Sequence, residues 1–313
     1  MKAMRDAWGD KLVELGRKDP RTVVLDGDLA NSTKADKFAK AHPDRFFQMG
    51  IAEQNLIGVA AGLASLGYVP WTSSFTVFFT HRAIDPIRML VAQSHANVKI
   101  VGSYSGLLIG AVGKTHLDIQ DLAIMRAMPD MTVLAPADNT ELLAMMDWAN
   151  EVDGPVYLRI VRDPVPDVVQ AGHTFRPGAV YELRQGTDVA LVGTGAQTGR
   201  LLTVHYQLLT EGISAAVVHV PCLKPLDADG LRDPLSGFEL VVTAEEHSVY
   251  GGLGGLVAET LTAAGPSPRI ERIGIDDSWG ESAPNDFMLE KHGLSPERIT
   301  ARVRAALRAP VRN

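Results

Sequence analysis

A single carboxylate at the start of an apolar helix is the first candidate for chemistry. Glu53 stands three positions after Gly50, and the residues from 56 to 64 are almost all small or apolar. A carboxylate at the mouth of such a helix is poorly solvated, which raises its affinity for a proton. Glu53 could therefore share a proton with the nitrogen of a heteroaromatic ring. The alternative is a structural role, in which the carboxylate caps the helix or favours its dipole.

Two aromatic residues follow this helix at a spacing that suits ring binding. On a helical turn, Phe75 and Phe78 would share one face. Two rings on one face can form a wall for a planar heterocycle. The alternative is ordinary core packing, although three Phe within five residues are a modest enrichment over an aromatic content of 6%.

A polar, glycine-rich loop at 110–121 supplies a candidate proton carrier. His116 could donate to a substrate oxygen or move a proton. The Gly-x-x-Gly-Lys-Thr pattern in this loop lacks the longer glycine spacing of a P-loop, so we exclude nucleotide binding of that kind. Taken alone, Lys114 and His116 are more often solvated loop residues.

Scattered polar residues are candidates for an anion site: Arg5, Ser32, Arg159 and Arg162. Arginine offers a forked donor that suits phosphate, but each of these residues alone also fits a surface or an interface. No metal ligands are assigned in this chain. Gly27-Asp28 followed by Asn55 imitates a diphosphate–metal motif, but Leu29 stands where that motif needs glycine. No cluster of His, Cys and Asp suggests another metal site.

The composition predicts a globular protein of one or two domains with a sizeable core, because 46% of 313 residues are hydrophobic. A net charge of −7 without a basic patch does not favour nucleic acid or an anionic membrane. The single cysteine, Cys222, excludes an internal disulfide and suits a reducing compartment. The start lacks the apolar core of a signal peptide, and no apolar run reaches membrane-spanning length. We therefore expect a cytoplasmic protein.

The elements that must position these residues alternate between helix and strand. Periodicity predicts helices at 5–16, 53–64, 84–94, 119–128 and 138–148, and strands at 22–25, 69–71, 98–101, 132–135 and 156–160. Strands of this length alternating with helices indicate a parallel sheet covered on both faces.

A proline-rich stretch at 163–178 lacks helical periodicity and is predicted to be a linker. The alternation then resumes, with strands at 188–192, 215–220 and 240–244 and a helix that ends at Thr210. We therefore predict an α/β protein of two domains with largely parallel sheets. The domains cover residues 1–175 and 185–313, and the second is the smaller.

In their order along the chain, these motifs resemble the C-terminal part of transketolase, over essentially the whole sequence. Residues 50–55 look like the family's pyrimidine-side glutamate motif, and 26–32 resemble the segment that supplies an aspartate near the cofactor. Thr115-His116 and the following 121–129 resemble its Thr-His segment and helix. Three tail segments are similar to the family's C-terminal domain: 245–248, 251–254 and 279–284.

The resemblance implies thiamine diphosphate as cofactor and a role for each candidate. Glu53 would hydrogen-bond N1′ of the pyrimidine as a catalytic residue, and Phe75 and Phe78 would stack on that ring. Asp28 would lie near the cofactor. The reaction implied is transfer of a two-carbon ketol unit from a ketose to an aldose.

Substrate contacts follow from the same resemblance. His116 would contact the hydroxyl or carbonyl oxygens of the substrate, as a second catalytic residue. Arg5, Ser32 and Arg162 match the positions that hold an acceptor's phosphate. Between the two late arginines, Arg162 matches better than Arg159.

The resemblance also implies a second polypeptide. In a single-chain transketolase, a domain that binds the diphosphate and Mg²⁺ precedes this region, whereas here only a few residues precede Arg5. We therefore predict an N-terminal partner subunit that carries a Gly-Asp-Gly…Asn motif and the Mg²⁺ ligands. Two copies of each chain would form an α2β2 heterotetramer with active sites between chains.

Two departures from the family pattern concern the sugar. Val112 stands where an aspartate touches a donor hydroxyl, and Tyr104 stands where a histidine helps to hold phosphate. Valine cannot accept a hydrogen bond, and polar sites discriminate strongly when one partner is missing. The departures favour a non-standard sugar or sugar phosphate over pentose-phosphate substrates.

Three other interpretations remain open. The β subunit of a 2-oxo acid dehydrogenase has a similar length and architecture, but the Thr115-His116 loop and the 279–282 tail argue against it. A relative of 1-deoxyxylulose-5-phosphate synthase is disfavoured by the short N-terminus. A non-catalytic scaffold subunit of the same fold is consistent with Val112 and Tyr104, but not with the retained Glu53.

Overall fold

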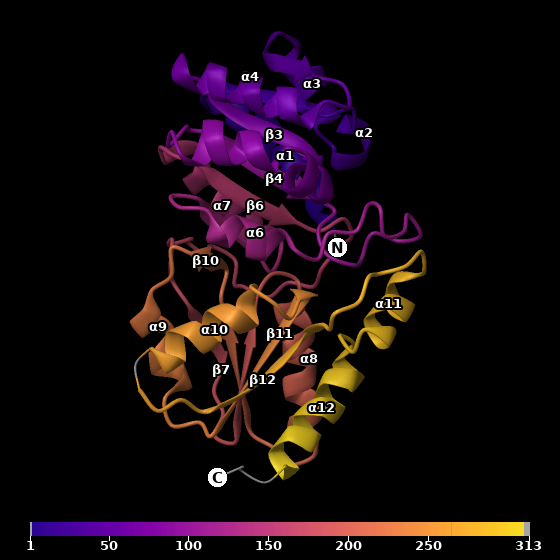
Figure 1. Ribbon diagram of the computed structural model, residues 1–313, viewed down its shortest axis with the longest axis vertical. Coiled ribbons are helices and arrows are strands. Elements are labelled where there is room, and N and C mark those ends of the chain that lie inside the picture. The colour runs from indigo at the N-terminus through magenta and orange to yellow at the C-terminus, as the bar shows by residue number, and fades with distance from the viewer. Residues whose placement is uncertain (1, 264, 310–313) are drawn as a thin grey trace.

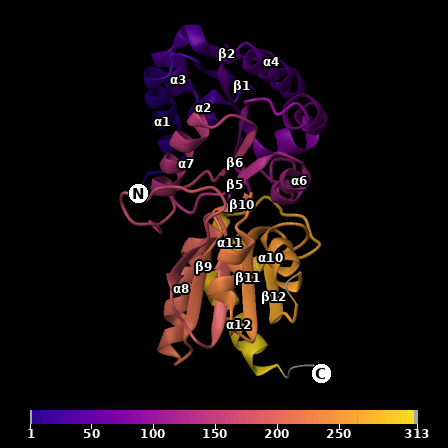
Figure 2. The same ribbon diagram turned by 90° about the vertical axis from the view of Figure 1, so that its left-hand side faces the viewer.

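The computed structural model describes residues 2–263 and 265–309, so Met1, Ala264 and 310–313, which fall within the predicted domain ranges, lie outside the described residues. Two α/β units are stacked along the long axis of the molecule (Figure 1), and the division is equally visible after a quarter turn (Figure 2). Each unit contains one sheet, and both sheets are mostly parallel. The predicted α/β fold class is confirmed.

The first sheet has seven strands in the order β10-β5-β6-β4-β3-β1-β2. They are β1 (Thr22–Asp26), β2 (Phe46–Gln48), β3 (Val69–Phe75), β4 (Lys99–Ser103), β5 (Thr132–Leu134), β6 (Val156–Ile160) and β10 (Cys222–Lys224). Strands β1 to β6 pair in parallel, while β10 runs antiparallel to β5. A strand from the second half of the chain therefore completes the first sheet.

Helices cover both faces of this sheet, which explains why β1, β3, β4 and β6 are buried along their whole length. The helical elements are α1 (Met4–Lys18), α2 (Ala30–Thr33), α3 (Asp36–Ala41), η1 (Pro43–Arg45), α4 (Glu53–Ser65), η2 (Phe78–Arg82), α5 (Ile84–Pro86), η3 (Ile87–Ala92), α6 (Asp121–Ala127) and α7 (Asn139–Glu151). Two of them, η2 and η3, are π-helical.

The second sheet has five strands in the order β12-β11-β8-β9-β7. They are β7 (Tyr181–Arg184), β8 (Val189–Gly193), β9 (Ala215–His219), β11 (Leu240–Ser248) and β12 (Arg269–Ile275). Only β7, an edge strand, is antiparallel. The accompanying helices are α8 (Gln197–Thr210), α9 (Ala228–Arg232), η4 (Asp233–Leu235), α10 (Leu253–Thr262), α11 (Asn285–Lys291) and α12 (Pro296–Arg308).

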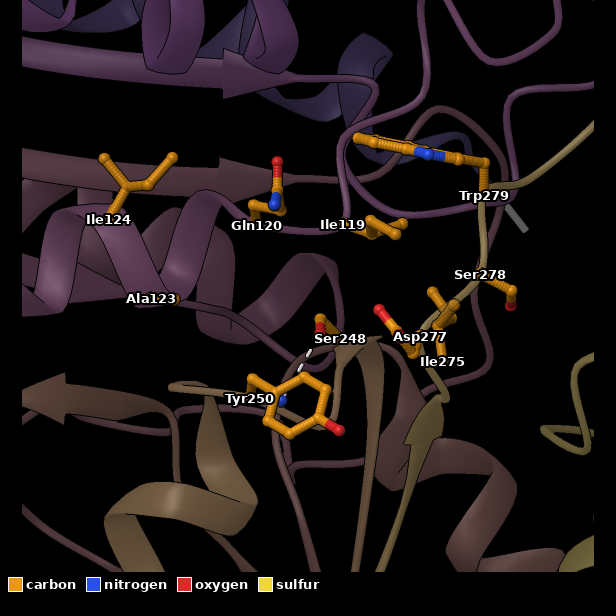
Figure 3. Close-up of a pocket in the computed structure, with 10 residues that line it drawn as sticks. All are labelled: Ile119, Gln120, Ala123, Ile124, Ser248, Tyr250, Ile275, Asp277, Ser278 and Trp279. Atoms are coloured by element: carbon orange, nitrogen blue, oxygen red, sulfur yellow. Dashed lines mark hydrogen bonds between the residues drawn. The ribbon is translucent and has the colours of Figure 1, made fainter.

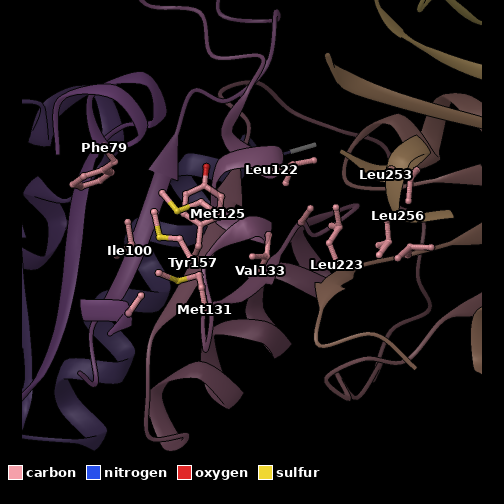
Figure 4. Close-up of a cluster of buried hydrophobic side chains, with 14 of the residues drawn as sticks. Phe79, Ile100, Leu122, Met125, Met131, Val133, Tyr157, Leu223, Leu253 and Leu256 are labelled. Carbon is pink, nitrogen blue, oxygen red and sulfur yellow. The ribbon is translucent and has the colours of Figure 1, made fainter. Parts of the chain in front are cut away.

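One hydrophobic cluster runs across the boundary between the two units (Figure 4). Met125 and Val133 from the first unit belong to it together with Leu253 and Leu256 from the second and with Leu223 on β10. Burial of apolar surface on this scale holds the units together as one packed body. The loops at the boundary are consequently positioned by both units.

The strand order brings several candidate residues to one edge of the first sheet. Strands β4, β3 and β1 are neighbours and run in parallel, so their carboxyl ends meet there. Gly27 follows β1, Phe75 ends β3 and Tyr104 follows β4. Ligand sites of parallel α/β sheets form at this edge.

No helix in the described ranges 2–263 and 265–309 combines the length and the apolar character needed to cross a membrane.

Candidate active site

Glu53 begins α4 with its side chain fully buried. The hydroxyl of Ser74, on β3, donates to Oε1 at 3.1 Å, and the Arg82 guanidinium donates to Oε2 at 2.6 Å. The residue before the helix, Ala52, provides no side-chain cap. The carboxylate therefore bonds to side chains of two other elements, which sets it apart from a simple helix cap.

Arg82 reaches Glu53 because η2 is π-helical. In this turn, the N–H of Ala83 donates to the carbonyl of Phe78, five residues earlier, at 3.2 Å. The wider turn leaves Arg82 next to the start of α4, with its guanidinium carbon 4.6 Å from the centroid of the Phe78 ring. Sequence analysis missed Arg82, because no local pattern signals a π-helical turn; such turns are frequent at functional sites.

Phe75 and Phe78 do lie together, but not on one helical turn. Phe75 is the last residue of β3 and Phe78 the first of η2, so the expectation of a shared helical face was wrong. Their rings stack with centroids 5.9 Å apart and planes 18° apart. His116 meets both rings edge-on, at 6.1 Å from Phe75 and 5.5 Å from Phe78. Three predicted site residues thus form one aromatic cluster.

Tyr104 joins this cluster to the candidate anion site. Its ring stacks on Phe75 at 4.2 Å, and its hydroxyl accepts a hydrogen bond from Arg5 at 2.5 Å. The same hydroxyl donates to the backbone carbonyl of Ser32 at 3.1 Å. The Arg162 guanidinium lies 5.7 Å from the ring centroid. Arg5, Ser32 and Arg162, far apart in sequence, therefore converge on one buried tyrosine.

The backbone at Tyr104 is strained. Its φ of 61° lies in the left-handed region, which bulky residues rarely adopt. Strain of this kind persists only where the surrounding structure enforces it, and it is concentrated at functional sites. Stacking on Phe75 and the two hydrogen bonds of the hydroxyl supply that enforcement.

Asp28 follows β1 with a φ of 66°, its N–H donates to Gln48 at 2.9 Å, and its side chain is exposed. The preceding Gly27 faces the Glu53 carboxylate directly. A Cβ at that position would lie 3.4 Å from Oε1 of Glu53 and 3.2 Å from the Ser74 hydroxyl, so any other residue here would crowd the carboxylate. One residue earlier, burial raises the pKa of the Asp26 carboxyl.

The loop that carries His116 is supported by the second unit. The N–H of Gly110 donates to Asn285 at 2.9 Å, and the Ser282 hydroxyl donates to the carbonyl of Ala111 at 2.6 Å. Within the loop, Nδ1 of His116 shares a hydrogen bond of 2.9 Å with the Thr115 hydroxyl. Val112 is 46% exposed on the same loop. The 279–284 segment thus helps to position the histidine.

Arg159, the other late arginine, bonds to a different set of residues. Its guanidinium donates to Asp121 at 2.8 Å and to the carbonyl of Glu246 at 2.8 Å, and both charged side chains are buried. It links the two units, which is a structural role.

A separate hollow of about 360 Å³ lies between the units (Figure 3). Residues from both units line it, including Ile119, Tyr250 and the largely exposed Trp279. None of the predicted site residues is among its lining residues. The candidate site is instead the edge of the first sheet, where Arg5, Arg82 and Arg162 lie.

In comparisons with known proteins, each of the two α/β units corresponds to one family model. Residues 1–167 match the family model of the transketolase pyrimidine binding domain, and residues 178–299 match that of the transketolase C-terminal domain. The fold and the site therefore define the pyrimidine-binding and C-terminal units of a transketolase-type transferase.

Individual proteins support the same conclusion. A Methanocaldococcus jannaschii protein described as a transketolase C-terminal section is 40% identical over 96% of this chain and 95% of its own length. The 6-deoxy-6-sulfo-D-fructose transketolase subunit SqwH of a Clostridium species is 39% identical, over 97% and 93%. A solved split-gene transketolase, described as an inactive β4 tetramer, is 44% identical and superposes with a TM-score of 0.88, over 97% and 98%.

The chain belongs to the transketolase family. Because these relatives match over almost their whole length, it corresponds to the C-terminal subunit of a split transketolase, as the sequence motifs predicted.

Proposed function

We propose that this chain acts with an N-terminal partner subunit in thiamine-diphosphate-dependent transfer of a two-carbon ketol unit from a ketose to an aldose. The observation that carries the proposal is the buried Glu53 carboxylate beside the stacked rings of Phe75 and Phe78. A buried carboxylate with lone pairs free beside an aromatic wall suits a ring that presents an N–H group.

The residues present fit the pyrimidine half of the cofactor. Glu53 offers a hydrogen-bond acceptor, Gly27 leaves room beside it, and Phe78 offers a partly exposed aromatic face. Asp28 follows Gly27 on the same turn and is the proposed residue at the border of the ring. When bound, the cofactor supplies the nucleophilic carbon that carries the ketol unit.

The protein's own residues divide the remaining work. Glu53 holds a proton at N1′ of the pyrimidine, and His116 donates to the hydroxyl or carbonyl oxygens of the substrate. Arg5 and Arg162, with Ser32, bind the anionic end of the sugar, for which forked guanidinium donors are suited.

The diphosphate and Mg²⁺ are assigned to the partner subunit. In the described parts of this chain, no group of three or more His, Cys, Asp or Glu could hold a metal ion. The solved relative that forms a tetramer of one chain type is described as inactive, which supports the need for a second chain. We propose an α2β2 heterotetramer in the cytoplasm, with each site between chains.

The proposed substrate is a non-standard ketose with a charged terminal group, either phosphate or sulfonate. Val112 removes a hydrogen-bond acceptor from the loop of His116, and Tyr104 places a neutral phenol between two arginines. The relative that is named for 6-deoxy-6-sulfo-D-fructose is consistent with such a sugar.

Calorimetry of thiamine diphosphate binding with Mg²⁺ tests the proposal, for this chain alone, for the partner alone and for the assembled mixture. We expect tight binding in the mixture only. The Glu53→Gln variant should assemble normally in sedimentation velocity but lose turnover by about 100-fold or more. An assembled mixture that binds no cofactor would instead favour the scaffold interpretation.

A further inference from the structure

Glu53 has an unexpected partner in Arg82, and this ion pair suggests how the carboxylate is controlled. The pair joins Nη1 of Arg82 to Oε2 of Glu53 at 2.6 Å. The Glu53 side chain is fully buried, whereas that of Arg82 is 43% exposed. Arg82 thus keeps part of its hydration, and most of the desolvation cost of the pair falls on the carboxylate.

We propose that Arg82 is the positioning residue of the site, which keeps Glu53 ionised and holds its carboxylate in one orientation as a hydrogen-bond acceptor. The inference rests on the proposed function, because it specifies how Glu53 meets the cofactor ring.

The geometry of the carboxylate supports an acceptor role. Ser74 donates to Oε1 and Arg82 donates to Oε2, so each oxygen has one protein donor. A carboxylate oxygen can accept two hydrogen bonds, and one position on each oxygen therefore remains for a ligand. A protonated carboxyl would carry an O–H donor on one of these oxygens. The two hydrogen bonds from Ser74 and Arg82 therefore favour the ionised form of Glu53.

The charged groups around α4 single out Arg82. The elements packed against α4 are β1, β3, η2, α5 and η3. Among their described residues, β3 has no titratable side chain, Asp26 at the end of β1 bonds to other groups, and His81 on η2 is exposed. Asp85 on α5 pairs with Arg88 on η3 at 2.9 Å. Arg82 is the cation in contact with Glu53.

The burial of Glu53 makes its protonation depend on the contact with Arg82. A carboxylate removed from water favours its neutral, protonated form unless a cation compensates. The bond of 2.6 Å from a guanidinium is of the strong, charge-assisted kind. With Arg82 in place, an ionised Glu53 would accept a hydrogen bond from the ring nitrogen of a bound cofactor, and the proton on that nitrogen would be supplied by solvent.

Two further contacts hold Arg82 in this position. Its guanidinium lies over the Phe78 ring at 4.6 Å, within the range of cation–π attraction. The side-chain amide of Gln54, the neighbour of Glu53 on α4, donates to the Arg82 carbonyl at 3.0 Å. The arginine is thus tied to the helix of the glutamate and to the aromatic wall at once.

The test compares Arg82→Gln, Arg82→Lys and the control Arg304→Gln in the assembled heterotetramer. Arg304 is a matched control because its side chain is 39% exposed and pairs with Glu211 at 3.0 Å, in the second unit. Thiamine diphosphate with Mg²⁺ is titrated calorimetrically between pH 6 and 8 in two buffers of different ionisation enthalpy. This gives both the affinity and the number of protons taken up on binding.

We expect about one proton fewer to be taken up on cofactor binding in Arg82→Gln than in the wild type, because Glu53 would already hold the proton. The affinity at pH 7 should fall about tenfold, which corresponds to the loss of one charge-assisted contact. Arg82→Lys should keep the wild-type proton uptake, since it keeps the charge but not the fork. Arg304→Gln should behave as the wild type.

Wild-type proton uptake and affinity in Arg82→Gln would overturn the inference, whatever the result for Arg82→Lys. Should Arg82→Gln fail to assemble, the lysine variant decides, because altered proton uptake there contradicts a role that depends on charge. Glu53→Gln separates the two proposals. If it keeps wild-type turnover, the proposed function fails, whereas wild-type proton uptake and affinity in Arg82→Gln, with turnover lost in Glu53→Gln, remove the role of Arg82 alone.

Discussion

The Tyr104 hydroxyl accepts a hydrogen bond of 2.5 Å from the Arg5 guanidinium, across the carboxyl edge of the first sheet. A second bond, of 3.1 Å, joins the same hydroxyl to the carbonyl of Ser32. Arg5 is thereby held in place before any substrate arrives. Binding an anion then requires little additional ordering of this side chain, which lowers the entropic cost of binding.

Removal of this hydroxyl should weaken binding of the charged sugar. In Tyr104→Phe, the ring can still stack on Phe75, but Arg5 loses its hydrogen-bond acceptor. Hydrogen bonds to charged groups contribute about 1.5–3 kcal/mol. We expect KM for the anionic substrate to rise about tenfold with kcat within about twofold, in steady-state kinetics of the assembled enzyme. A fall in kcat with KM unchanged would contradict this role.

The two phenylalanines of the aromatic wall should respond differently to truncation. Phe75 is 6% exposed and packs against Tyr104, so Phe75→Ala should destabilise the chain by about 3 kcal/mol or more. Phe78 is only partly buried. Phe78→Ala should cost about 1 kcal/mol of stability and weaken cofactor binding instead. Urea unfolding and calorimetry measure the two effects separately, and equal losses of stability would refute the distinction.

The buried ion pair between the units should be important for stability. Asp121→Asn leaves the Arg159 guanidinium buried without its carboxylate, and breaking such a pair costs about 3–5 kcal/mol. Loss of the exposed pair between Arg302 and Glu271, in Arg302→Gln, should cost less than about 1 kcal/mol. Urea titrations of Asp121→Asn and Arg302→Gln give the two free energies of unfolding to be compared. Similar values for both variants would show that Asp121 does not stabilise the arginine.

Lys99 should make the stability depend on pH. Burial lowers the pKa of this lysine from 10.5 to about 7, with Nζ donating to the carbonyls of Val152 and Gly154 at 2.9 Å. Between pH 7 and 10.5 the unfolded chain therefore binds more protons than the folded one. Stability contributed by this group rises with pH across that window and is lost as the pH falls towards 7.

The Lys99→Met variant isolates this effect. The difference in free energy of unfolding between wild type and variant should shift in favour of the wild type when the pH is raised from 7 to 9. Urea titrations at the two pH values measure it, and a pH-independent difference would contradict the lowered pKa of Lys99.

Val112 offers a direct test of sugar selectivity. The residue is 46% exposed, so Val112→Asp should change stability by less than about 0.5 kcal/mol. It would place a hydrogen-bond acceptor on the loop of His116, and we expect kcat/KM for common ketose phosphates to rise about tenfold. A panel of donor sugars, with Val112→Ala as the control, measures the change. Equal effects of both variants would assign it to loop packing instead.

The sequence by itself determined the succession of helices and strands, as α1, β1, α4 and β6 illustrate. Apolar periodicity and turn residues are local properties, and for these four elements they suffice to predict type and order. The short strands β2 and β10 escaped detection, although the equally short β5 was predicted. The longer β12 and α12, near the end of the chain, were not predicted either. The motifs also named Glu53, His116 and Arg5 as candidates, each from its own segment.

Only the tertiary structure decided how these residues meet. The π-helical turn of η2 brings Arg82 to Glu53, and the neighbouring positions of β3 and β4 bring Phe75 against Tyr104. Strand order and turn geometry follow from packing between segments that are distant in sequence, so no local pattern records them. Tyr104 could be recognised as a departure from its family, but its place between Arg5 and Arg162 depends on contacts that exist only in the folded chain.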